Sequence, residues 1–519
     1  MDAAPISGPT ELPRTSRALG LAVAAGIVLL HVAVNLTTPY GFQRDEFLYF
    51  GMGQHLQFWR MDFPPFIAVV ANVSRSILGE SAAAMRFVSA LAAAAMAYAV
   101  ISVARRLGGR AYAQLLTAAC LLTSPLFLRA GSLYQPVVFD QLWWTLGLYS
   151  IVRLQESGDR RWWLALGLVG GIGLLTKFSI AFFGFSVLVA LLVTRERRTL
   201  LTPWPWLALA LALVLGSPSL VGQLRLGFPV VGQLHDLQAV QLARVTPFDF
   251  TLGQFLLTGP AFLIAVAGVA ALLASPHRAH LRVVGWTALA AFATLLLLHG
   301  KHYYLGPIYP VLFGIGAVVV ERSWTGARGR ALRVVAMATP CAFGLAVLPI
   351  GLPFLPPPRM EAYVRAIGLT DVVNRTNTGR ILRLPQDYAD MLGWEERVAA
   401  VARAYRALDP VRRAQAVIMA DNWGEAGALD FYGPRYGLPG VVSSSGSYWF
   451  FGPGSKPGTV VVIIGEKEAS LRRYCNRVTV AERITNDWTV PEEQDLSVLV
   501  CEGPRGTLQQ GWPGWAGRN

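Results

Sequence analysis

Long apolar stretches separated by short polar segments dominate the first 350 residues of the chain. Each is close to the roughly 20 residues that a helix needs to cross about 30 Å of hydrocarbon. The pattern predicts an α-helical polytopic membrane protein with about eleven transmembrane helices. The apolar stretches fall near residues 18–37, 82–103, 111–128, 136–152, 162–176, 178–194, 204–220, 256–274, 283–299, 303–320 and 331–350.

Two shorter amphipathic stretches lie in the first long polar segment, residues 38–81. Residues 47–58 and 65–78 mix aromatic, aliphatic and polar positions. Such mixtures are typical of helices that lie in the membrane interface. We therefore expect two interfacial helices in this loop.

The pattern changes after Gly351, so we place a membrane domain at residues 1–352 and a C-terminal soluble α/β domain at residues 353–519. The junction, PFLPPPRM, is rich in proline and predicts a stiff linker. The runs AVIMA (416–420) and TVVVIIG (459–465) predict buried strands. The residues between them predict a helix and a further strand. No GxGxxG motif suggests nucleotide binding.

The net charge of +14 comes mostly from arginines in the short segments between apolar stretches. This distribution follows the positive-inside rule and predicts a cytoplasmic N-terminus and an extracytoplasmic C-terminal domain. It argues against nucleic acid as a partner. The first apolar stretch is too long for a cleavable signal peptide. Arginine far outnumbers lysine, a bias typical of GC-rich bacterial genomes, so we expect a bacterial cytoplasmic membrane.

Four cysteines divide into two pairs. Cys120 and Cys341 lie in apolar stretches and are expected to be packed and unreactive. Cys475 and Cys501 flank strand-like segments of the C-terminal domain. A disulfide between them would fit an oxidising compartment, although spacing alone does not establish the geometry.

Ionisable residues cluster directly after the first apolar stretch: Arg44, Asp45, Glu46 and Asp62. Charged groups near hydrocarbon are costly and tend to mark function, whereas a solvated loop is the alternative. Adjacent helical residues point about 100° apart, so Asp45 and Glu46 cannot face one site equally. One could act on a substrate while the other caps the helix or holds an arginine. Asp62 precedes Phe-Pro-Pro and could cap the next helix, or have a catalytic or metal-binding role.

Further charged groups lie near the predicted outer ends of later apolar stretches. Asp140 is expected to face water or to pair with Arg129, its nearest candidate partner in sequence. The segment HGKHYYLGPIYP contains Lys301, His302 and Tyr303, which could bind an anionic lipid headgroup or belong to an interfacial belt. The same alternatives hold for Lys177. No strong metal motif is present.

The chain resembles the C-type (GT-C) multi-span glycosyltransferases, close to the branch of lipid A aminoarabinose transferases and protein O-mannosyltransferases. The resemblance rests on RDEFLYF (44–50), DFPPF (62–66), VVFDQLWW (137–144), LLTKFS (174–179) and KHYYLGPIYP (301–310). It implies a polyprenyl-phosphate sugar donor, Asp45 as general base, and Asp62 and Asp140 as acceptor- or metal-binding carboxylates. One departure is Phe63, because the aminoarabinose transferases have lysine before the Pro-Pro pair.

These features predict a glycosyltransferase that inverts the anomeric carbon at the outer face of the membrane. Donor phosphate would then be held by Lys301, His302, Tyr303, Lys177 and Arg129. The acceptor could be a lipid, a glycan, a protein or a secreted small molecule, with membrane lipid around the protein. No cofactor is assigned, although a divalent metal could bind at Asp62. The rivals are a flippase or transporter of lipid-linked sugars, and a membrane-anchored sensor built on the C-terminal domain.

Overall fold

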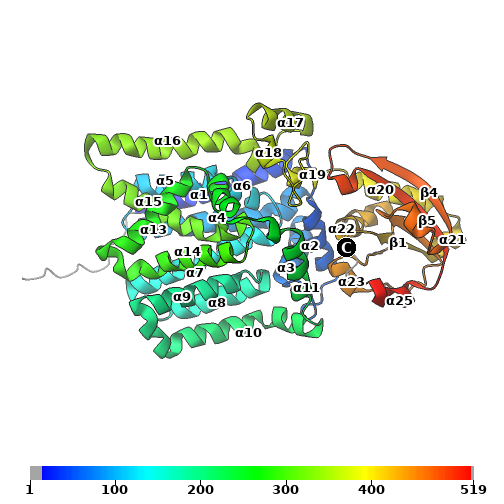
Figure 1. Cartoon of the computed structure of the whole chain (residues 1–519), viewed down its shortest axis with the longest axis horizontal. Helices are drawn as coiled ribbons and strands as arrows, with labels where there is room; N and C mark the ends of the chain where they lie inside the picture. Colours follow the sequence, from blue (N-terminus) through cyan, green and yellow to red (C-terminus); the bar gives the residue numbers. More distant parts are fainter. Residues whose placement is uncertain (1–13, 516–519) are drawn as a thin grey trace, which may run out of the picture.

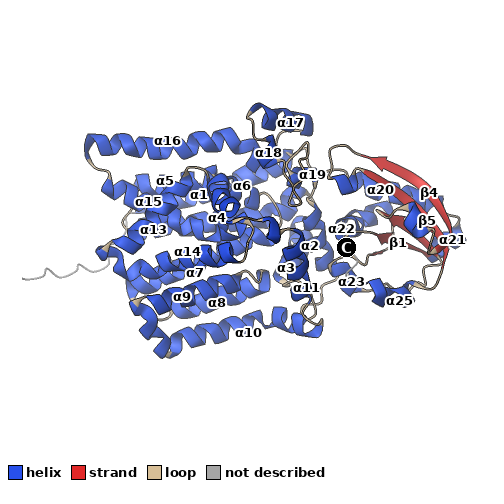
Figure 2. Ribbon diagram, viewed as in Figure 1, coloured by secondary structure: helices blue, strands red, loops and turns tan. Residues whose placement is uncertain are grey.

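The computed structural model describes residues 14–515 and divides into a bundle of long helices and a smaller part built on a sheet (Figure 1). Figure 2 shows all strands at one end of the molecule. The helices up to residue 351 are α1 (Arg14–Thr37), α2 (Arg44–Gln54), α3 (Phe66–Leu78), α4 (Ala82–Arg106), α5 (Ala111–Thr123), α6 (Pro125–Gly131), α7 (Pro136–Ser157), α8 (Trp162–Thr176), α9 (Ile180–Val193), α10 (Pro203–Arg225), α11 (Pro229–Val240), α12 (Pro247–Thr258), α13 (Ala261–Ala274), α14 (Arg282–Leu297), α15 (Tyr309–Ser323) and α16 (Gly326–Gly351).

Each predicted apolar stretch coincides with one of these helices or with a broken pair of them. Six of the described helices are long and apolar enough to cross a membrane, and up to eight spans result if each of two bent pairs counts as one. The helices α8 and α9 have 15 and 14 residues and are therefore shorter than a typical span. The chain is thus a multi-span membrane protein, while the count of eleven stays a prediction.

Both bent pairs break at proline. α5 and α6 meet at 71° just before Pro125, and α12 and α13 meet at 110° beside Gly259 and Pro260. Proline has no N–H to continue the helical hydrogen bonds, and it favours the first turn of a new helix. Gly259 has φ 58°, a left-handed conformation that glycine adopts without strain.

The two amphipathic stretches of the first loop form α2 and α3, as expected. They lie between the long helices and the sheet region in Figure 1. The packing of α3 differs along its length, since Ile67 is buried whereas Ile77 is 73% exposed. This asymmetry suits a helix at the boundary of the apolar region.

The C-terminal region contains a mixed five-stranded sheet with the order β2-β1-β3-β5-β4. β1 (Ala416–Ala420) pairs in parallel with β2 (Val441–Val442) and β3 (Val460–Ile464), whereas β5 (Asp495–Pro504) is antiparallel to β3 and to β4 (Cys475–Thr485). The predicted strand runs thus form β1 and β3. The longer helices of this region are α17 (Pro357–Ala366), α20 (Trp394–Ala407) and α22 (Trp423–Tyr432). The shorter ones are α18 (Thr370–Val373), α19 (Gln386–Ala389), α21 (Pro410–Gln415), α23 (Ser447–Phe451), α24 (Glu468–Leu471) and α25 (Leu508–Gly511).

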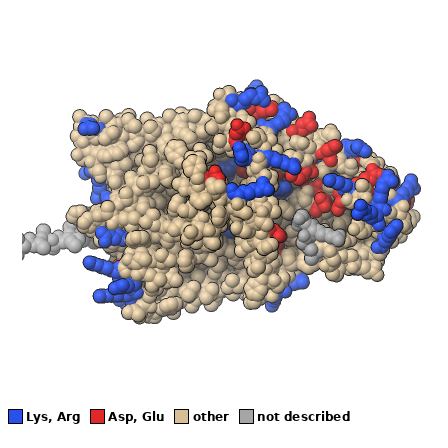
Figure 3. Space-filling model, viewed as in Figure 1, with Lys and Arg blue, Asp and Glu red and all other residues tan. Residues whose placement is uncertain are grey.

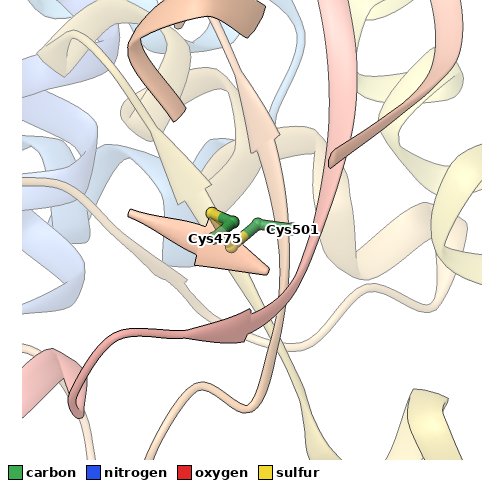
Figure 4. Close-up of a disulfide and its surroundings, with 2 residues drawn as sticks. All are labelled: Cys475 and Cys501. Carbon is green, nitrogen blue, oxygen red and sulfur yellow. A yellow bond between two sulfur atoms is a disulfide. The ribbon is translucent and has the colours of Figure 1, made fainter. Parts of the chain in front are cut away.

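A disulfide joins Cys475 at the start of β4 to Cys501 in β5 (Figure 4). The pairing considered from the sequence is therefore present. Cys120 and Cys341 are free, as expected for residues of the apolar helices.

The proline-rich segment after α16 is not an extended linker. α17 begins within it at Pro357, and Met360 and Val364 are buried in a cluster that also contains Tyr40 and Leu133. The chain after residue 351 therefore packs first on the end of the helical bundle. Apolar burial of this kind fixes the position of a segment that composition alone predicts to be a spacer.

Helix α22 packs directly on α2 and joins the sheet region to the first loop. Phe431 of α22 lies with its ring centroid 6.1 Å from Phe47 and 5.0 Å from Phe50 of α2. Gly427 allows close approach, because a Cβ there would collide with the backbone of Phe47. The sheet region is consequently held against the loop that contains Asp45.

Charge is distributed unevenly along the molecule (Figure 3). The middle of the helical part is almost free of charged side chains on the face shown, lysine and arginine gather at its left end, and both signs cover the sheet region. This arrangement matches the pattern of arginines between apolar stretches, as expected for a membrane protein.

Candidate functional site

The first turn of α2 separates its two adjacent carboxylates. Gln43 and Glu46 form a capping box, in which the Gln43 side chain accepts from the Asp45 N–H and the Glu46 carboxylate accepts from the Gln43 N–H at 2.6 Å. Glu46 points inward and is fully buried, while Asp45 is partly exposed. The Asp45 carboxylate has no hydrogen bond or ion pair within the part of the chain that the structure describes.

Glu46 is held by four donors. The Arg86 guanidinium of α4 binds both its oxygens, with Nε–Oε1 at 2.8 Å and Nη2–Oε2 at 2.6 Å. The Tyr134 backbone N–H donates to Oε1 at 2.8 Å, in addition to the Gln43 N–H. A carboxylate with its lone pairs used in this way is poorly suited to accept a proton. Glu46 therefore both caps the helix and holds an arginine, the role that the sequence left open for one of the two carboxylates.

Lys301 is a cation that interacts electrostatically with Asp45. Desolvation lowers the pKa of the Lys301 ammonium, the Asp45 carboxylate acts in the opposite direction, and Lys177 lowers it further. Lys301 precedes a short 3-10 turn, residues His302–Ile308, that leads into α15. A carboxylate and two ammonium groups from α2, the α15 approach and the end of α8 thus come together.

Lys177 follows the last residue of α8 and faces two tyrosines. Its Nζ lies 5.6 Å from the ring centroid of Tyr303 and 5.0 Å from that of Tyr304. The Asp140 carboxylate of α7 interacts electrostatically with Lys177. Asp140 is buried, and its Oδ1 has no hydrogen-bond partner among the described residues. Two tyrosine rings and the Asp140 carboxylate therefore surround the Lys177 ammonium, which also interacts with Lys301.

Two predicted members of the cationic set have other partners. Arg129 does not pair with Asp140, so that expectation was wrong: its Nε binds Asp387 at 3.1 Å, and its guanidinium lies 4.0 Å from the Tyr388 ring centroid. The reason is that α19, far away in sequence, packs on the end of α6. The ring of His302 lies against Gly253 of α12, and no described contact joins it to Asp45.

Asp62 is buried at a junction with the sheet region. Its Oδ2 accepts a hydrogen bond from Ser447 Oγ at 2.8 Å, and Gln233 of α11 approaches the same oxygen at 3.4 Å. Burial raises the pKa of Asp62 to about 6, against the effect of these hydrogen bonds. Asp62 does not cap α3, whose N-cap is Pro65 without a side-chain hydrogen bond.

The surroundings of Asp62 do not fit a metal ion. Among the described residues, no group of three or more histidine, cysteine, aspartate or glutamate side chains could hold one. The polar neighbours of Asp62 are a hydroxyl and an amide. The prediction of a metal at this position is therefore not supported by the donor set.

The sequence did not indicate that residues after 385 reach the same site. The Arg44 Nε lies 3.9 Å from Asp390 Oδ1, and its guanidinium lies 5.4 Å from the ring centroid of Trp423. Burial raises the pKa of Asp390 to about 7, although Arg44 lowers it and Asp45 raises it. Asp387 also interacts with Lys301. These residues carry no motif, and only the packing of α19 and α22 on α2 brings them to the site.

Two solved structures have a fold similar to that of this chain. The crystal structure of ArnT from Cupriavidus metallidurans in the apo state aligns with a TM-score of 0.62 at 18% identity, over 93% of this chain and 97% of that one. The same protein bound to undecaprenyl phosphate aligns with a TM-score of 0.59 at 18% identity and equal coverage. The chain therefore shares the fold of ArnT. The resemblance expected from the sequence is confirmed.

A family model described as dolichyl-phosphate-mannose-protein mannosyltransferase matches residues 62–221. The matched segment includes Asp62, Asp140 and Lys177, and it begins after Asp45. The archaeal oligosaccharyltransferase AglB from Archaeoglobus fulgidus, solved with an inhibitory peptide and a dolichol-phosphate, aligns at a TM-score of 0.48 and 13% identity, over 89% of this chain and 71% of that one. No curated protein matches the sequence significantly.

Proposed function

We propose that the protein transfers a sugar from a polyprenyl-phosphate-linked donor to an acceptor at the outer face of the bacterial cytoplasmic membrane. The observation that carries the proposal is a partly exposed carboxylate, Asp45, that interacts electrostatically with the ammonium of Lys301 on a fold shared with ArnT. The bound undecaprenyl phosphate of the ArnT structure supports a lipid-phosphate donor.

Asp45 is the general base in this proposal. It accepts the proton of the acceptor hydroxyl while that oxygen forms a bond to the anomeric carbon. The bond between the anomeric carbon and the donor phosphate oxygen breaks at the same time, and its electron pair remains on the phosphate. Because no covalent enzyme intermediate forms, the anomeric configuration is inverted.

Lys301 and Lys177 hold the phosphate. The charge on the leaving phosphate grows in the transition state, and ammonium groups in a partly desolvated site stabilise it more than they would in water. The ring of Tyr303 lies 5.6 Å from Lys177 Nζ, which places this tyrosine beside the proposed phosphate site. The Asp140 carboxylate interacts with Lys177 and favours its charged form.

The acceptor approaches from the side of the sheet region. Helix α22 of the sheet region packs on α2, so an acceptor held by that region would lie beside the helix that contains Asp45. Its class is a lipid, glycan, protein or secreted small molecule that offers a hydroxyl or an amine. In this proposal, the C-terminal region is extracytoplasmic.

Asp45→Asn tests the proposal. The substitution keeps the shape of the side chain but removes the base, so turnover should fall about 10²–10⁴-fold, measured with purified protein and a radiolabelled polyprenyl-phosphate sugar. Binding of undecaprenyl phosphate should be retained. Asp236→Asn is the matched control, because that carboxylate lies in α11 and is 84% exposed. Normal turnover in Asp45→Asn would overturn the base assignment, and transbilayer movement of the donor without transfer would identify a flippase.

A further inference from the structure

A cavity of about 520 Å³ lies apart from the cluster of Asp45 and the two lysines. It lies between the first loop, the start of α4 and the helices α20 and α22. Phe42, Glu80, Glu395, Tyr432 and Arg435 are among the residues that line it. The volume is in the range typical of small-molecule sites.

The charged groups of this cavity are not all paired with each other. Both oxygens of the Glu80 carboxylate have partners. Arg75 binds one of them, and Arg435 donates to the other with Nη2–Oε2 at 2.6 Å. Glu395 accepts a hydrogen bond from the Tyr436 hydroxyl at 3.2 Å and has no ion-pair partner among the described side chains. The cavity therefore offers a carboxylate that is free to receive a cation.

The opposite charge is supplied by Arg435, which also interacts electrostatically with Glu395. The Arg435 guanidinium donates to Glu80 through Nε and Nη2, which leaves Nη1 for a further acceptor. The first residues of α4, Ser81 and Ala82, also line the cavity, and the N-terminus of a long helix favours an anion. An anion beside Arg435 and a cation beside Glu395 would both be stabilised.

The cavity lies at the membrane boundary. α4 is one of the candidate spans, so Ser81 and Ala82 mark its outer end. Ile77 and Leu78, at the end of α3 and just before the cavity, are 73% and 44% exposed. Apolar side chains exposed beside a polar cavity are what a lipid meets where its acyl chains end and its headgroup begins.

We propose that this cavity binds the headgroup of a zwitterionic phospholipid in which an ammonium and a phosphate lie a few bonds apart, as in phosphatidylethanolamine. The ammonium binds Glu395, the phosphate lies between Arg435 and the start of α4, and the acyl chains follow the exposed side of α3. An anionic lipid without an ammonium would be repelled by Glu395.

Competition between headgroups tests the proposal. Purified full-length protein is titrated with a short-chain phosphatidylethanolamine that carries a fluorophore on one acyl chain, and anisotropy reports binding. Unlabelled phosphatidylethanolamine should compete about tenfold better than phosphatidylglycerol, the difference expected from one charge-assisted hydrogen bond. Glu395→Gln should bring this ratio close to one. Glu396→Gln, an exposed neighbour outside the cavity, should keep it.

Equal competition by the two lipids, or the same ratio in both variants, would overturn the proposal. Soluble glycerophosphoethanolamine distinguishes a lipid from a free metabolite: the lipid should bind far more tightly, and equal affinity would rule out the lipid as ligand. Stronger displacement by glucosamine than by phosphatidylethanolamine would identify a saccharide site instead. The assay measures binding alone, so its result does not depend on the proposed transferase activity.

Discussion

Glu46 and Arg86 form a fully buried ion pair that fixes the start of α2. Both side chains are 0% exposed, and the guanidinium also donates to Asn35 Oδ1 and to the Gly41 carbonyl oxygen, each at 3.0 Å. Because Asp45 immediately precedes Glu46, this pair also determines where Asp45 points. The catalytic proposal for Asp45 thus depends on a neighbour that is itself out of reach of any substrate.

Glu46→Gln should destabilise the protein strongly. Removal of one partner leaves a buried charge without compensation, which costs about 3–5 kcal/mol. Glu468→Gln, which breaks an exposed pair with Arg472, should change stability by less than about 1 kcal/mol. Thermal unfolding of the purified proteins in one detergent measures both. A Glu46→Gln protein with wild-type stability and no turnover would instead give Glu46 a direct role in the chemistry.

Lys301→Ala should weaken the binding of undecaprenyl phosphate about 10- to 100-fold, as expected for loss of a charge-assisted hydrogen bond. Turnover should also fall, because charge on the phosphate develops during the reaction. Lys301→Arg should restore part of the binding. Lys467→Ala is the control, since that lysine is exposed in the sheet region. Equal binding in Lys301→Ala and Lys467→Ala would exclude Lys301 from the phosphate site.

Asp390 predicts a pH dependence of stability. Burial raises the pKa of this carboxyl from its usual 3.8 to about 7 in the folded protein, so the folded state holds a proton that the unfolded state releases at lower pH. The contribution of this group is fully present below about pH 4 and is lost as pH rises to about 7, by about 4 kcal/mol at most.

Asp390→Asn should accordingly flatten the decline of the unfolding temperature between pH 5 and pH 7. The exposed Asp371→Asn serves as control. Unfolding temperatures measured across this range in the same detergent compare the three proteins. An identical decline in wild type and Asp390→Asn would assign the pH dependence to other groups, such as Asp62.

The disulfide between Cys475 and Cys501 closes a segment with a sequence separation of 26 residues. Replacement of both cysteines by alanine should destabilise the sheet region by about 3 kcal/mol, because the unfolded chain regains loop entropy. Alkylation in denaturant followed by mass spectrometry should label two thiols, Cys120 and Cys341, before reduction and four after it. Labelling of all four without reduction would show that the bond is absent in the cell.

Several parts of the structure followed from the sequence, because they depend on local patterns. Apolar stretches of about 20 residues must satisfy their backbone hydrogen bonds within a helix, so they located the helices. A run of five apolar residues, Ala416–Ala420, predicted β1 for a similar local reason. The number of true spans did not follow, since α8 and α9 are short and two helices break at proline.

The tertiary structure alone decided which charged groups form the site. The sequence identified Asp45 and Glu46 as a pair, but their roles differ because Arg86, 40 residues further on, binds Glu46 and leaves Asp45 free. The sequence suggested Asp140 as the partner of Arg129, whereas Arg129 binds Asp387, 258 residues away. Charge pairing acts through space and depends on burial, so a pattern along the chain reveals the residues that can ionise, and only packing determines their partners.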